Sequence, residues 1–108
     1  MESSTKYSIN MAKGYWVVAY RSISDDAAVK EYGKLVGPVL QANGGRPLVR
    51  TADAVQAVES GLKQRTVVIE FESFEKAKAT YNSDEYKAAT KVLGNAVERD
   101  FRIVEGVD

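Results

Sequence analysis

The stretch Arg65–Glu72 reads R-T-V-V-I-E-F-E and is the most β-prone run in the chain. Its odd positions, Val67, Ile69 and Phe71, are all apolar, whereas its even positions are mixed and include Glu70. Side chains alternate between the two faces of a strand, so one face of this run can be sealed and the other only partly so. We therefore expect a strand in the middle of a sheet, with helices covering the apolar face.

The composition limits both the size of the protein and its chemistry. The 108 residues suffice for one domain, and 15 basic residues balance 15 acidic ones, so no net charge attracts nucleic acid or an anionic membrane. The chain has no cysteine and no histidine. These absences exclude a disulfide framework, a thiol nucleophile, a serine–histidine triad and the commonest zinc and haem sites, and we expect neither a cofactor nor a metal.

Neither a membrane span nor a signal peptide is predicted. No run approaches the roughly 20 apolar residues of a spanning helix, and the N-terminus has no apolar core of the signal-peptide kind, so we expect a cytoplasmic protein. The polar stretch Met1–Asn10 has no hydrophobic periodicity. We predict that residues 1–12 are a disordered arm or a cloning remnant and that residues 13–108 form a single domain.

The first half of the domain predicts a strand followed by a helix. Tyr15–Tyr20 is aromatic and β-branched, Ser24–Asp26 is typical of a helix start, and Asn43–Gly45 of a helix end. Pro38 should kink or split this helix. An apolar stripe at helical spacing comprises Val29, Tyr32, Val36, Val39 and Leu40, with Gly33 and Gly37 falling inside it.

The second half of the domain completes a strand–helix–strand–strand–helix–strand order. Arg46–Thr51 has a proline near its start and predicts an edge strand, and Ala52–Gln64 connects it to the central strand. A helix interrupted at Asn82-Ser83 and a last strand at Arg99–Val104 follow. This order is ferredoxin-like, βαββαβ, with a four-stranded antiparallel sheet and helices on one face. The opposite face carries too many apolar groups for water alone, which favours a partner.

Three fragments support a family resemblance that covers nearly all of Gly14–Gly106. They are G-G-R-x-L-V-R at residues 44–50, V-I-E-F-x-S at residues 68–73 and V-E-G at residues 104–106. Together they resemble the DUF1330 family, small bacterial proteins of unassigned function within the dimeric α+β barrel superfamily. The resemblance implies a ferredoxin-like monomer whose sheet packs face to face with that of a second chain. Asp84 and Leu93 depart from the family, which usually has proline and often arginine there.

Glu70 is the candidate catalytic residue. A carboxylate within a central strand must be paired, neutralised or solvated by a cavity. It could act as a general base or orient a substrate. Alternatively, it forms a structural ion pair with an arginine, for which the candidates are Arg46, Arg50, Arg65 and Arg102.

The candidate ligand-binding residues are arginines and tyrosines. Arg46 and Arg50 are four positions apart, which on a regular strand puts them on one face, where they could clamp a carboxylate or phosphate or pair with acids such as Glu70. We predict that Glu70 and these arginines form one polar cluster on the side away from the helices. Arg65, Tyr32 and Tyr86 complete the candidates, although both tyrosines could be core residues whose hydroxyls find partners.

These observations leave two main hypotheses about function. The first is a homodimer that binds a small polar or anionic metabolite in a pocket lined by Tyr, Arg and Glu, either as a binding protein or as a cofactor-independent enzyme. The alternative is a structural or regulatory dimer with no catalytic activity. RNA binding is disfavoured because the strands have neither the stacking aromatic signature nor a basic platform.

Overall fold

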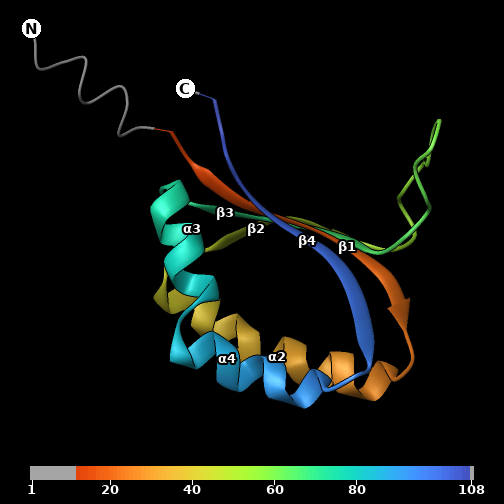
Figure 1. The fold of residues 1–108 in the computed structure, drawn as a ribbon, viewed down its shortest axis with the longest axis horizontal. Coiled ribbons are helices and arrows are strands. Elements are labelled where there is room, and N and C mark those ends of the chain that lie inside the picture. The colour runs from red at the N-terminus through yellow and green to blue at the C-terminus, as the bar shows by residue number, and fades with distance from the viewer. Residues whose placement is uncertain (1–11, 108) are drawn as a thin grey trace, which may run out of the picture.

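The computed structural model describes residues 12–107 as one antiparallel sheet with its helices on a single side (Figure 1). The arm predicted for residues 1–12 lies outside the described residues apart from Ala12, so the division of the chain there stays a prediction. The elements in order are β1 (Gly14–Ile23), α2 (Asp26–Ala42), β2 (Arg46–Thr51), β3 (Thr66–Phe71), α3 (Phe74–Tyr81), α4 (Asp84–Thr90), a 3₁₀ helix η1 (Lys91–Leu93) and β4 (Val97–Glu105).

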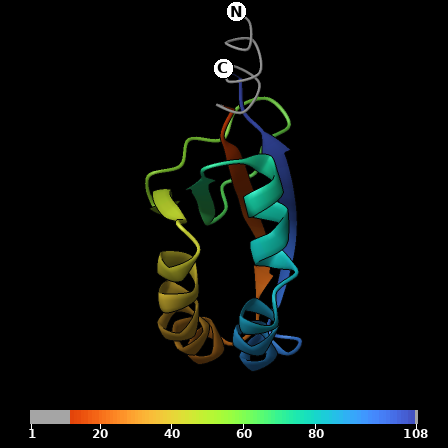
Figure 2. The same ribbon diagram turned by 90° about the vertical axis from the view of Figure 1, so that its left-hand side faces the viewer.

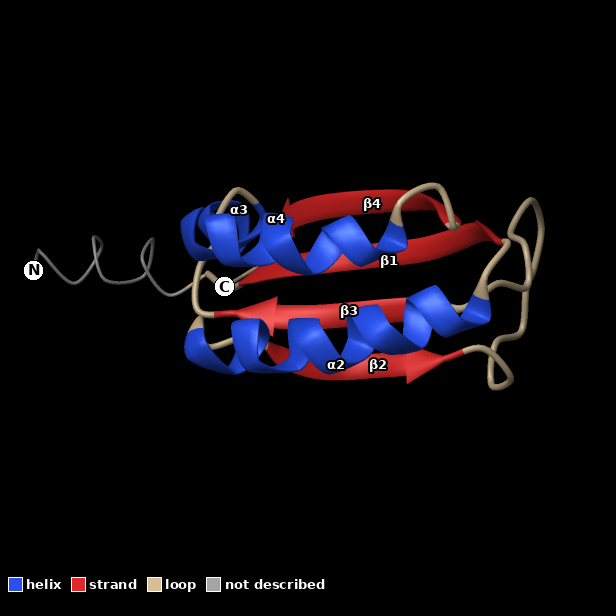
Figure 3. Cartoon of the chain, turned by 90° about the horizontal axis from the view of Figure 1, so that it is seen from below, coloured by secondary structure: helices blue, strands red, loops and turns tan. Residues whose placement is uncertain are grey.

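The sheet has the strand order β2-β3-β1-β4, and every neighbouring pair is antiparallel. The predicted ferredoxin-like arrangement is therefore confirmed, with β1 and β3 in the centre and β2 at an edge. Seen from the helix side, α2 lies over β2 and β3, while α3 and α4 lie over β1 and β4 (Figure 3). α2 runs beside α4 and packs against it (Figure 2).

The helices start where their capping residues predict. Asp25 accepts from the backbone N–H groups of Ala27 and Ala28, and Ser73 and Ser83 cap α3 and α4 in the same way. Pro38 does not split α2, which runs unbroken to Ala42; the proline is exposed, so water can satisfy the carbonyl that loses its partner. No helix within residues 12–107 is long and apolar enough to cross a membrane.

The hydrophobic core is centred on Trp16, which is 2% exposed. Its ring lies 5.0 Å from those of Phe71 and Tyr86 and 5.2 Å from that of Phe101, and its indole N–H donates to the carbonyl of Ala77 at 2.9 Å. This cluster seals α3 and α4 onto β1 and β4. Leu93, where the resemblance implies a frequent arginine, is buried in the same core.

Candidate functional site

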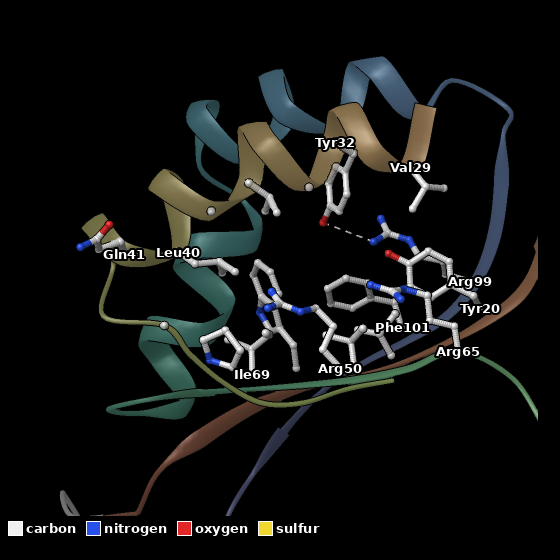
Figure 4. A pocket seen from close by; sticks show the side chains of 18 residues that line it. Tyr20, Val29, Tyr32, Leu40, Gln41, Arg50, Arg65, Ile69, Arg99 and Phe101 are labelled. Carbon is white, nitrogen blue, oxygen red and sulfur yellow. Dashed lines mark hydrogen bonds between the residues drawn. The ribbon is translucent and has the colours of Figure 1, made fainter. Parts of the chain in front are cut away.

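A cavity of about 350 Å³ lies between α2 and the helix-facing side of the sheet (Figure 4). α3 packs directly against β1, β3 and β4, whereas α2 packs mainly against α4 and η1. The space under α2 is therefore only partly filled by side chains. All four strands and α2 contribute residues to the cavity wall.

Three arginines from different parts of the sheet line this cavity. Arg50 comes from β2, Arg65 directly precedes β3, and Arg99 comes from β4. Their side chains extend into the space below Tyr32 (Figure 4). Among the described residues, no carboxylate lines the cavity, and none forms an ion pair with these three arginines. The cavity therefore holds positive charge that no acidic side chain of residues 12–107 neutralises.

Arg99 is bound by aromatic side chains. Its two terminal nitrogens donate to the hydroxyls of Tyr32 and Tyr86, each at 3.4 Å, and the two hydroxyls lie 2.8 Å apart. The guanidinium also lies 5.7 Å from the ring centroid of Tyr20 and 5.0 Å from that of Phe101. The arrangement holds Arg99 in one orientation at the cavity wall.

The protonation states of this cluster follow from its burial. Desolvation raises the pKa of Tyr32 above the ordinary value, and the neighbouring Tyr86 adds to this effect. Desolvation also raises the pKa of Tyr86, although Arg99 opposes the shift. Burial by itself would lower the pKa of Arg99, but Tyr86 and Tyr32 raise it above its usual value. Both phenols are therefore neutral and Arg99 is positively charged at physiological pH.

Arg65 has a buried hydrogen-bond donor, its Nε, without a partner among the described residues. Its guanidinium carbon lies 5.7 Å from the Tyr20 ring centroid, the same separation as that of Arg99. A buried donor without an acceptor costs about 1–3 kcal/mol, so an acceptor in the cavity would stabilise this side chain.

Glu70 lies on the opposite side of the sheet, as its alternation with Ile69 and Phe71 predicts. Arg46 Nη2 donates to Glu70 Oε1 at 3.1 Å, and the Tyr15 hydroxyl approaches Glu70 Oε2 at 3.5 Å. Glu70 is not among the residues that line the cavity. The expected pocket of tyrosine, arginine and glutamate therefore contains tyrosine and arginine but not Glu70.

Arg46 and Arg50 do not share a face, and this part of the prediction is wrong. Arg46 pairs with Glu70 and Pro47 with Ile69, but the register then shifts so that Val49 pairs with Val68 and Arg50 with Val67. Leu48 is the extra residue of a β-bulge. One inserted residue reverses the alternation, so Arg50 lies on the helix side and lines the cavity.

Arg102 is not part of the Glu70 cluster either. Its guanidinium donates to Asp100 at 3.0 and 3.3 Å, and Arg21 bonds the same carboxylate at 2.8 Å. These bonds, first of all that from Arg102, lower the pKa of Asp100. The outer face of the sheet therefore has two separate polar groups rather than the single cluster that we predicted.

Sequence reasoning placed Arg65, Tyr32 and Tyr86 among the candidates but missed Arg99. The sequence does carry a signal for Arg99: positions 99, 101 and 103 fall on one face of the last strand, so Arg99 shares its face with the apolar residues Phe101 and Ile103. Within residues 12–107, no group of three or more His, Cys, Asp or Glu side chains is placed to hold a metal ion.

Several solved structures share the fold at low sequence identity. A protein of unknown function from Rhodopseudomonas palustris is 15% identical with a TM-score of 0.69, covering 99% of this chain and 93% of that one. A dimeric ferredoxin-like protein of unknown function from Thermobifida fusca is 13% identical with a TM-score of 0.59, covering 90% and 92%. An EthD family protein from Bacillus halodurans is 17% identical with a TM-score of 0.56, covering 88% and 99%. No curated protein matches the chain.

The sequence itself assigns the family. The family model of the domain of unknown function DUF1330 matches residues 13–107, which include every strand and helix of the described structure and all three cavity arginines. The chain therefore belongs to the DUF1330 family.

Proposed function

We propose that this protein binds a small organic anion in the cavity beneath α2. The observation that supports the proposal is the meeting of Arg50, Arg65 and Arg99 around one space with no carboxylate among the described lining residues. Guanidinium groups bind carboxylate or phosphate oxygens through paired, charge-assisted hydrogen bonds. An anion would neutralise the arginines and provide an acceptor for the buried Nε of Arg65.

The rest of the cavity wall indicates an anion with an apolar body. The arginines are concentrated on the sheet side, and the remaining wall is mostly apolar, with Val18, Val36, Leu40 and Ile69 among its members. The volume of about 350 Å³ is near the lower end of the usual range for small-molecule sites, ~300–1,000 Å³. A monocarboxylate with a compact hydrocarbon part fits this combination.

The lining residues favour binding over acid–base catalysis. The described part of the wall has no His, Cys, Asp or Glu that could accept a proton. Tyr32, whose pKa is raised by desolvation, stays protonated near neutral pH and cannot act as a general base there. The proposed role is therefore that of a binding protein.

The proposal includes a homodimer formed through the outer face of the sheet. Val17 on β1, Val49 on β2 and Val104 on β4 are each 37–38% exposed. A partner sheet would remove these apolar side chains from water. The similar protein from Thermobifida fusca, described as dimeric, provides further support.

The chain contains its own probe for the anion site. Trp16 is the single tryptophan and lines the cavity, so its fluorescence should change when a ligand enters. We would titrate the protein with acetate, hexanoate, benzoate and inorganic phosphate at low ionic strength. At least one carboxylate should bind, and Arg65→Gln should weaken its affinity by roughly 10- to 100-fold, because a charged hydrogen bond contributes ~1.5–3 kcal/mol.

Arg46→Gln is the matched control for Arg50→Gln. Both arginines belong to β2, but Arg46 pairs with Glu70 on the opposite side of the sheet. Arg50→Gln should weaken binding and Arg46→Gln should not. If none of the three carboxylates binds to the wild-type protein, the proposal fails, and the alternative of a structural or regulatory dimer is favoured.

A further inference from the structure

The side of α2 that faces the cavity carries two glycines. Gly33 and Gly37 are four residues apart, so they lie on the same side of the helix, and both line the cavity. Apart from proline, glycine is the residue least suited to a helix interior. A Cβ placed on either glycine would meet no atom within 4 Å. Packing within residues 12–107 therefore does not demand glycine at these positions.

The absence of side chains at these two positions helps to create the cavity. This side of α2 also carries apolar residues that would normally fill the space above a sheet, namely Val29, Tyr32, Val36 and Leu40. Gly33 and Gly37 interrupt this apolar stripe over one helical turn. At these two positions the backbone of α2 itself forms the cavity wall, so a ligand can approach the helix closely.

Aromatic side chains lie on the sheet side of the same space. Trp16 and Phe101 both line the cavity, and their rings are 5.2 Å apart and inclined at 62°. Tyr20, beside Arg65 and Arg99, continues this floor toward the charged end. The cavity thus combines a glycine wall, an aromatic floor and arginines, which suits a planar ring bearing a carboxylate.

We propose that Gly33 and Gly37 determine specificity, and that the ligand is an aromatic carboxylate whose ring lies between the glycine wall of α2 and the floor formed by Trp16 and Phe101. This inference rests on the proposed anion-binding function and names its ligand class. The carboxylate is held by the arginines, and the ring occupies the space that larger residues at positions 33 and 37 would fill.

The wild-type protein tests the ring preference directly. Benzoate and cyclohexanecarboxylate have the same charge and the same number of heavy atoms, but only benzoate is planar. Benzoate should bind at least fivefold more tightly than cyclohexanecarboxylate, as followed by Trp16 fluorescence or calorimetry. Equal affinities, or tighter binding of cyclohexanecarboxylate, would overturn the aromatic assignment.

Variants at position 37 test the glycine wall. Gly37→Leu should weaken benzoate binding at least tenfold and leave the affinity for acetate, which has no ring, within about twofold. Gly37→Ala is the milder variant: it should raise the melting temperature, because alanine favours the helix, and still weaken benzoate binding measurably. Ala27→Leu is the control, because it adds the same side chain to an exposed position of α2 outside the cavity.

The outcomes separate this inference from the function on which it rests. If no carboxylate binds to the wild-type protein, the anion-binding proposal fails, and this inference fails with it. If benzoate and acetate bind and Gly37→Leu changes neither affinity, the glycine wall is refuted while anion binding stands. Equal loss of both ligands would also refute it, since the leucine would then be acting on the arginines.

Discussion

The phenolic oxygens of Tyr32 and Tyr86 lie 2.8 Å apart, and the Arg99 guanidinium donates to both. Tyr32 belongs to α2, Tyr86 to α4 and Arg99 to β4. One polar cluster therefore connects two helices, α2 and α4, to an edge strand. Desolvation raises the pKa of both phenols. The folded protein therefore keeps two protons that the unfolded chain releases near pH 10.

The first prediction is a loss of stability in alkaline solution that depends on this tyrosine pair. The stabilisation is fully present below about pH 10, the ordinary tyrosine pKa, and is lost as the pH rises toward the higher folded-state pKa values. The melting temperature should fall between pH 9 and pH 11, and the Tyr32→Phe/Tyr86→Phe double variant should show a shallower fall. Tyr81→Phe, at an exposed tyrosine, should keep the wild-type slope. Equal slopes in the wild type and the double variant would contradict the prediction.

The second prediction concerns Glu70→Gln. The Arg46–Glu70 pair lies on the outer face, and its side chains are 71% and 18% exposed, so water screens the interaction. The free energy of unfolding should fall by no more than about 1 kcal/mol, and the affinity for carboxylates should not change. Urea denaturation and the Trp16 titration measure the two quantities. A loss of carboxylate affinity would show that Glu70 acts on the ligand after all.

The third prediction contrasts two glycine-to-alanine substitutions. A Cβ on Gly14 would lie 2.6 Å from the backbone Cα and N of Phe74, at the start of α3, where the chain cannot easily move. Gly14→Ala should therefore lower the free energy of unfolding by about 1–3 kcal/mol. Gly33→Ala, with open space around its Cβ, should raise that free energy by up to ~1 kcal/mol. Urea denaturation of both variants would check this, and equal effects would contradict it.

The fourth prediction is a dimer that a charge on the outer face disrupts. Light scattering at micromolar concentration should give twice the chain mass of 11.9 kDa. A sheet-to-sheet interface of the obligate kind buries roughly 2,000 Å² or more, which is enough to keep the dimer together at that concentration. Val17→Lys places a charge in the centre of the outer face and should give a monomer. Leu35→Lys is the matched control, since Leu35 on α2 is 39% exposed, close to the 37% of Val17, and should leave the dimer intact. A wild-type monomer would refute the proposed assembly.

Local patterns predicted most of the fold correctly. The alternation in Arg65–Glu72 identified a central strand and the side on which Ile69 and Phe71 are buried. Ser24–Asp26 located the start of α2, the interruption at Asn82-Ser83 the start of α4, and a proline at position 47 marked the edge strand. These features depend on interactions between residues close in the chain, so they can be read without knowing what packs against them.

The candidate site was predicted less completely. Tyr32, Tyr86 and Arg65 were named and lie at or beside the cavity, but Arg50 was assigned to the wrong face and Arg99 was not considered. The face of Arg50 depends on the bulge at Leu48, which forms when β2 pairs with β3. The sequence of an edge strand does not fix its pairing with the neighbouring strand, so an extra residue can be accommodated at several positions.

The chain's own residue pattern thus determined the order of strands and helices, the buried side of the central strand β3 and the helix starts, because each of these follows from neighbours within a few residues. The cavity beneath α2 depends on contacts between residues that are far apart in the chain. Arg99 reaches Tyr32 across 67 residues, and the cavity exists where α2 packs on α4 and η1 while Gly33 and Gly37 leave the space above the sheet open. Such contacts arise only once separate elements pack together, since their geometry depends on every element in the contact.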